Sequence, residues 1–245
     1  NGGLFTLATG RYPAFVHNFA ADFVPNAPIV AGNGGILYDL EKEEILSVKI
    51  LPGSLAPLLS FAFDTLPTVR EFCVGGIGES AGDYIRGHLG IPTEDGLFQQ
   101  YRPIGSAKEI LLDLALRKKE YTRVFFVQKP EDTQKNYAAL KAQFSKDYTV
   151  VTGWECGIEI LPKGCGKGEM IGELRRRIGG IHTTVCVGDY ENDITMLNMA
   201  DLGYAVENAP DFVKAHAERI APSCNHSAIA KIIEELDKTY KAVDI

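Results

Sequence analysis

The sequence predicts an α/β protein in which a parallel sheet is interrupted by a second, inserted α/β region. Three observations support this class. After Lys163, strand-like apolar runs alternate with helix-like segments, which is typical of a parallel sheet covered by helices on both sides. The run TTVCVGD, residues 183–189, has the apolar character of a strand buried on both faces. Short strand-like and helix-like runs also alternate between Gly53 and Pro162, enough for a separate sheet with helices on one face.

Hydrophobic periodicity and turn residues give the expected elements in order. The expected strands are residues 4–8, a run ending at residue 31, and residues 36–40, 45–50, 68–74, 123–128, 148–153, 157–162, 183–189 and 202–206. The expected helices are residues 55–66, 80–90, 106–121, 130–144, 167–179, 192–200, 209–220 and 227–240. The last helix is expected to bury one apolar face, formed by Ile229, Ile232, Ile233 and Leu236. We therefore expect residues 1–52 and 163–245 to form one discontinuous domain and residues 53–162 a second, inserted domain.

Composition excludes several classes of protein. A formal net charge of -7 argues against nucleic acid as the main partner, although a local cation or a metal could still attract small anions. No apolar run approaches the ~18 residues needed to span a bilayer, so we expect no membrane partner. The five cysteines are scattered and include no CxxC pair, which favours reduced thiols and a cytoplasmic location. The sequence does not predict the oligomeric state.

The stretch VCVGDYENDITML, residues 185–197, carries three acids behind an apolar strand. Asp189, Glu191 and Asp193 match the first, third and fifth positions of a calcium-binding EF-hand loop, but Ile194 and Ala200 stand where that loop needs glycine and glutamate. The alternatives are a solvated acidic turn and a magnesium site. Because open α/β sheets bind ligands at the carboxyl ends of their strands, we expect Asp189 to be a Mg²⁺ ligand supported by Asp193. Glu191 is expected to face water.

Two further stretches could contact a phosphate. LPKGCGKGEM, residues 161–170, is not a P-loop, because Leu161 and Gly168 occupy positions that need glycine and serine or threonine. It does place Lys167 at the start of a helix after a glycine-rich loop, which favours phosphate binding, although a solvated lysine would explain it too. LATGR, residues 7–11, ends a strand at Thr9; taken alone, it favours a turn or helix N-cap over a ligand contact. Asn33 in AGNGG is equally ambiguous.

Thr9 in LATGR, Lys167 in LPKGCGKG and Asp189 with Asp193 in VGDYENDITML resemble motifs II, III and IV of the haloacid dehalogenase-like (HAD) phosphatases. The order and spacing resemble the Cof-type, sugar-phosphatase-like branch, and the resemblance covers nearly the whole chain. It implies a Rossmann-like core, a mobile α/β cap, and Mg²⁺-dependent transfer of a phosphoryl group to an aspartate, followed by hydrolysis. Thr9 and Lys167 would then contact the phosphoryl group, and Asp189 and Asp193 would serve the metal. Contacts to substrate or phosphate are expected from Gly10, Arg11, Asn33 and Asn192.

One motif of that family has no match here. The family's first motif, DxDGT after an apolar strand, supplies the nucleophile; TEDGL at Thr93 lacks the first aspartate and the preceding strand. The chain also begins inside an apolar run, so we expect the motif to lie upstream of Asn1 and expect residues 1–245 alone to be inactive. The expected function is a phosphatase for a small phosphorylated metabolite such as a sugar phosphate. The alternatives are a phosphotransferase or mutase, or a non-catalytic protein that binds phosphate ligands.

Overall fold

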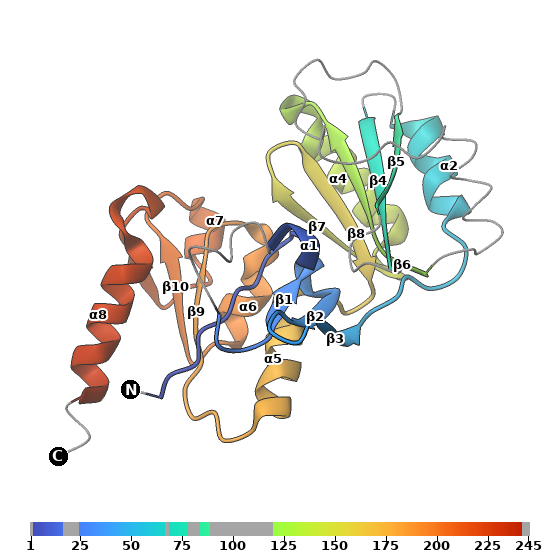
Figure 1. The fold of residues 1–245 in the computed structure, drawn as a ribbon. Coiled ribbons are helices and arrows are strands. Elements are labelled where there is room, and N and C mark those ends of the chain that lie inside the picture. Colours follow the sequence, from blue (N-terminus) through green and yellow to red (C-terminus); the bar gives the residue numbers. More distant parts are fainter. Residues whose placement is uncertain (1, 17–24, 67–68, 78–83, 89–119, 242–245) are drawn as a thin grey trace. The chain divides into compact units, whose positions relative to one another are not determined.

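The computed structural model describes residues 2–16, 25–66, 69–77, 84–88 and 120–241. These residues form two compact units, Asn1–Gly166 and Lys167–Ile245 (Figure 1). The first unit contains two sheets and the second contains one among the described residues, and each unit has its own helices and apolar core. The boundaries predicted from sequence, at residues 52 and 163, stay a prediction.

The first unit begins with a small antiparallel sheet in the order β1-β2-β3, formed by three strands that the sequence predicted. Its elements are α1 (Pro13–Val16), β1 (Ile29–Ala31), the 3-10 turn η1 (Gly32–Gly34), β2 (Ile36–Asp39) and β3 (Glu44–Val48). The prediction of a strand at residues 4–8 was wrong in extent. Ala8 forms one isolated parallel bridge to Val30, so the preceding segment is extended but is not a strand of this sheet.

The second sheet of this unit is antiparallel throughout, in the order β5-β4-β6-β8-β7. Its strands are β4 (Val69–Ile77), β5 (Tyr84–His88), β6 (Glu120–Gln128), β7 (Tyr148–Trp154) and β8 (Gly157–Pro162). The predicted helix at residues 80–90 was wrong, because its centre is β5, which pairs with β4. That pairing joins distant backbone groups and is invisible to local periodicity. The helix predicted for residues 106–121 lies outside the described residues apart from its last two, which begin β6.

Two helices, α2 (Ala56–Thr65) and α4 (Pro130–Phe144), supply the apolar core on one face of this sheet. Val124 and Phe126 of β6 and Ile158 and Ile160 of β8 join that core and are fully buried. Since side chains alternate along a strand, Arg123 and Glu159 project from the opposite face. The prediction of a sheet with helices on one face is therefore confirmed for the described helices.

The second unit contains a parallel sheet in the order β11-β10-β9, as the alternating pattern predicted. Its strands are β9 (Val185–Gly188), β10 (Leu202–Val206) and β11 (Arg219–Ala221). Its helices are α5 (Lys167–Ile178), η2 (Glu191–Asp193), α6 (Ile194–Met199), α7 (Asp211–Lys214), η3 (Cys224–His226) and α8 (Ala228–Lys241). Figure 1 shows α8 on one side of this sheet and α5 and α6 on the other, so the sheet has helices on both sides as predicted.

Two predictions in the second unit were wrong in detail. The helix predicted for residues 209–220 ends at Lys214, and the last part of that range is β11, which pairs with β10. In α8 the buried positions are Ala228, Ile232 and, in part, Leu236, one side chain every four residues. Ile229 and Ile233 are 44% and 45% exposed, so the buried face of α8 is narrower than the predicted one. Among the described residues, no helix has the length and apolar character needed to cross a membrane.

Candidate active site

Asp189 lies directly after β9, at the carboxyl end of the parallel sheet. The residue before it, Gly188, lies against Asp193. A Cβ added at Gly188 would stand 2.4 Å from the Cβ of Asp193, a separation that real side chains do not tolerate. Glycine at this position therefore allows the turn to fold back and bring Asp193 against the strand.

Asp193 uses both of its carboxylate oxygens inside this turn. Oδ2 accepts hydrogen bonds from the backbone N–H groups of Asp189, at 2.9 Å, and Tyr190, at 3.3 Å. Oδ1 accepts a hydrogen bond from the Lys167 ammonium, with 2.6 Å between Nζ and Oδ1. One carboxylate thus fixes the backbone that carries Asp189 and also the position of the lysine.

Lys167 is the first residue of α5, and its side chain is nearly as buried as that of its partner Asp193, at 8% and 5% exposed. Close packing of α5 on α6 puts it there. A Cβ on Gly168 would stand 2.2 Å from the Thr195 carbonyl oxygen, and the Gly168 N–H donates to the Thr195 hydroxyl at 3.0 Å. Gly168, which ruled out a P-loop in the sequence, is therefore the residue that lets the two helices meet.

The carboxylates of Asp189 and Asp193 form a locally negative site. Partial desolvation and the neighbouring Asp193 raise the pKa of Asp189, and the Lys167 ammonium opposes that rise. Among the described residues, no group of three or more His, Cys, Asp or Glu side chains is placed to hold a metal. Mg²⁺ needs fewer protein ligands, because it keeps several waters and binds through one or two carboxylates. The exposed Asp189 carboxylate, with Asp193 beside it, fits that ion.

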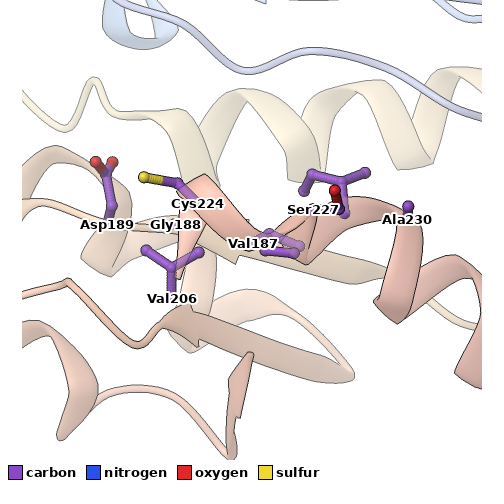
Figure 2. Close-up of a pocket in the computed structure, with 9 residues that line it drawn as sticks. Val187, Gly188, Asp189, Val206, Cys224, Ser227 and Ala230 are labelled. Atoms are coloured by element: carbon purple, nitrogen blue, oxygen red, sulfur yellow. The ribbon is translucent and has the colours of Figure 1, made fainter. Parts of the chain in front are cut away.

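A cavity of about 260 Å³ adjoins this strand end within the second unit (Figure 2). Asp189 lies at one end of it, while Cys224 and Ser227 contribute polar atoms from the segment before α8. The remaining lining is apolar or backbone and comes from Val187, Gly188, Val206, Ala228, Ile229 and Ala230. A space next to an exposed carboxylate could therefore receive a group larger than a water molecule.

Four of the predicted site residues, Thr9, Gly10, Arg11 and Asn33, lie in the first unit. The Thr9 hydroxyl accepts a hydrogen bond from the Arg11 N–H at 3.1 Å, which is the turn role that the sequence left open. A hydroxyl that accepts in this way still has its own proton to donate. Arg11 is exposed, whereas Asn33 is 1% exposed and adopts a left-handed backbone with φ 54°.

The other four, Lys167, Asn192, Asp189 and Asp193, lie in the second unit. Lys167 contacts Asp193, and Asp193 contacts the backbone of Asp189. Asn192 is half-buried within η2. Glu191, expected to face water, is also half-buried, in the same 3-10 turn.

The sequence did not single out Arg123 on β6 or Glu159 on β8. Their side chains form a buried ion pair, with 2.9 Å between Nη1 and Oε2 and exposures of 8% and 6%. Asn33 Nδ2 donates to Glu159 Oε1 at 2.7 Å, so a predicted site residue joins the pair. A signal was available for Glu159, which is a lone charge inside the apolar strand GIEILP, because such charges are rarely buried without a partner.

The fold and these strand-end residues place the molecule among α/β proteins that bind ligands at the carboxyl edge of a sheet. The chain belongs to the haloacid dehalogenase-like hydrolase family, whose model matches residues 1–233.

Its relatives include an HMP-PP phosphatase of Klebsiella pneumoniae, 23% identical over 234 residues that span 93% of this chain and 81% of that protein. A protein of Streptococcus pyogenes that carries the name phosphatase is 24% identical and is matched over 84% of its length, with 94% of this chain covered.

Solved structures share the fold. The HAD subclass IIB sugar phosphatase BT4131 superposes with a TM-score of 0.75 at 21% identity, covering 96% of this chain and 86% of the other. A HAD/COF-like hydrolase from Plasmodium vivax gives a TM-score of 0.74 at 23% identity, covering 96% and 83%. The family model confirms the predicted family, and the solved structures confirm the α/β fold class.

Proposed function

We propose that this protein is a Mg²⁺-dependent phosphatase that hydrolyses a small phosphorylated metabolite such as a sugar phosphate. The observation that carries the proposal is the arrangement around Asp193, which contacts the buried Lys167 ammonium and the backbone of Asp189 at the end of β9. Such an arrangement presents a fixed cation and a hard oxygen ligand at the same strand end. Both are what phosphoryl transfer needs, because its catalysis is mainly positioning and charge neutralisation.

Each residue has a role in this proposal. Asp189 holds the metal, and Asp193 supports that site by orienting the Asp189 backbone and the lysine. Mg²⁺, when bound, supplies charge neutralisation at the phosphoryl oxygens. Lys167 contributes a second positive charge to the same group.

Further contacts to the phosphoryl group and the substrate are proposed for the loop residues singled out in the sequence. The Thr9 hydroxyl donates to a phosphoryl oxygen, with Gly10 and Arg11 in the same loop. Asn33 and Asn192 support substrate binding. The resemblance implies an aspartate of a DxDGT motif as the nucleophile. Residues 1–245 contain no match to that motif, so the assays below use the full-length protein.

The relatives support the substrate class. One is named for HMP-PP and another for sugar phosphates, both small phosphorylated metabolites. We propose that residues 53–162 act as the cap that selects among such compounds, with CVGGIGE at residues 73–79 and Trp154 as candidate specificity positions. The scattered cysteines, which include no CxxC pair, support a reducing, cytoplasmic compartment.

The experiment is a phosphate-release assay with p-nitrophenyl phosphate and a panel of phosphorylated sugars and cofactor precursors. Release that requires Mg²⁺ and stops on addition of a chelator supports the proposal. Inorganic phosphate equal to the substrate consumed indicates hydrolysis, whereas transfer to an added acceptor sugar would replace the phosphatase with a phosphotransferase. Binding of these compounds without turnover by the complete protein would contradict the enzyme claim and favour a phosphate-ligand binder.

A further inference from the structure

The buried pair Arg123–Glu159 lies beside the loop that carries Thr9. Arg123 Nη1 donates to the Gly10 carbonyl oxygen at 2.7 Å as well as to Glu159 Oε2 at 2.9 Å. One guanidinium therefore joins the five-stranded sheet to the residue immediately after Thr9.

Asn33 holds the same loop from a second direction. Its backbone N–H donates to the Thr9 carbonyl oxygen at 3.0 Å, and its side-chain amide donates to Glu159 at 2.7 Å. A Cβ on Gly10 would approach the Asn33 amide to 3.1 Å, so the loop fits closely between Asn33 and Arg123. Glu159 thus receives hydrogen bonds from both residues that hold Thr9 and Gly10.

Tyr12 completes the contact. The Arg123 guanidinium carbon lies 4.6 Å from the centre of the Tyr12 ring, and the Tyr12 hydroxyl is hydrogen-bonded to the Thr122 hydroxyl. Tyr12 is fully buried. The loop from Thr9 to Tyr12 is therefore held by strand β6 at both ends, through Arg123 at Gly10 and through Thr122 at Tyr12.

Stability alone does not account for these charges. Desolvating an arginine and a glutamate is unfavourable, and a well-packed apolar pair of similar volume is often as stable or more so. What an apolar pair cannot do is direct a donor at one carbonyl oxygen. The Arg123 guanidinium directs a hydrogen bond at the Gly10 carbonyl oxygen, and Gly10 belongs to the proposed phosphate-binding loop.

We propose that Arg123 and Glu159 are positioning residues that hold the Thr9–Gly10 loop in the geometry needed to contact the phosphoryl group. The proposal rests on the proposed function, because Thr9 matters to catalysis only if the site handles phosphate. Arg123 acts through the Gly10 carbonyl, and Glu159 acts by fixing Arg123 and Asn33 together.

The test compares Arg123→Ala and Glu159→Gln with Arg177→Ala, a matched control whose arginine forms an exposed helical pair with Glu173. Hydrogen exchange followed by mass spectrometry first reports on peptides that cover residues 9–12 and 30–35, and needs no catalytic activity. We expect faster exchange there in both test variants and no change in the control. Glu159→Gln keeps the shape of the side chain, so it remains informative if Arg123→Ala does not fold.

Kinetics with p-nitrophenyl phosphate and Mg²⁺ give the second readout. We expect kcat to fall about 10- to 100-fold in the folded test variants, because a misplacement of about 1 Å can cost that much, while KM changes little. Guanidinium ion at low millimolar concentration should restore part of kcat in Arg123→Ala and none in the control. Unchanged exchange of residues 9–12 in a folded variant, or wild-type kcat per folded molecule, would overturn the positioning role. Absence of turnover in the wild-type protein would instead overturn the proposed function.

Discussion

Two buried cation–carboxylate pairs have the same chemistry and different surroundings. Lys167–Asp193 in the second unit and Arg123–Glu159 in the first have N···O distances of 2.6 and 2.9 Å and side chains that are no more than 8% exposed. The first pair adjoins an exposed carboxylate at the end of a parallel strand. The second lies within a sheet and is directed at the backbone of a loop. We propose that Lys167–Asp193 lies at the catalytic site and that Arg123–Glu159 positions the Thr9–Gly10 loop, which contributes to that site.

The largest effect is expected from breaking the pair at the strand end. Lys167→Met leaves the Asp193 carboxylate buried without its ammonium, which should cost about 3–5 kcal/mol of unfolding free energy and abolish phosphate release. Arg177→Met, on the same helix, breaks an exposed pair and should cost about 0.3–0.5 kcal/mol with activity unchanged. Urea unfolding followed by circular dichroism measures both values. If both variants lose the same unfolding free energy, the buried pair does not contribute more to stability than the surface pair.

The packing that places Lys167 can be tested on two glycines of one helix. Gly168→Ala forces a Cβ against the Thr195 carbonyl and should destabilise the protein by about 1–3 kcal/mol. At Gly172 a Cβ meets only ordinary contacts, 3.6 Å or more away, so Gly172→Ala should stabilise it by up to about 1 kcal/mol. In thermal unfolding, we expect the midpoint temperature to fall in Gly168→Ala and to rise in Gly172→Ala. An unchanged midpoint in Gly168→Ala would mean that α5 and α6 do not need this close approach.

The smallest effect concerns thiol reactivity beside the strand-end site. Burial, then the charges of Asp193 and Asp201, raises the pKa of Cys186 on β9 to about 12. Its reactive thiolate is therefore scarce at neutral pH and increases only as the pH approaches that value. At pH 8, iodoacetamide should label the exposed Cys224 at least about 100-fold faster than Cys186, as measured by peptide mass spectrometry. Comparable rates would show that β9 is open to solvent.

The sequence predicted the strand-end group better than the pair inside the sheet. Gly188, Asp189 and Asp193 are close in the chain, so one strand and one turn bring them together, and Lys167 begins a helix whose start was evident. Arg123 and Glu159 meet only after β6 pairs with β8, and no local pattern specifies that register. The same cause explains the missed strands β5 and β11, which exist through their pairing with β4 and β10.

The central claim is that Asp189 at the end of β9 serves a Mg²⁺-dependent release of phosphate. The most direct measurement is a Mg²⁺ titration of phosphate release by the complete protein, by Asp189→Asn and by Glu207→Gln, in which an exposed acid directly after β10 is neutralised. We predict saturable activation by Mg²⁺ in the wild type and in Glu207→Gln, and a loss of at least about 100-fold in Asp189→Asn. Wild-type turnover by Asp189→Asn, or release that is independent of metal, would contradict the account.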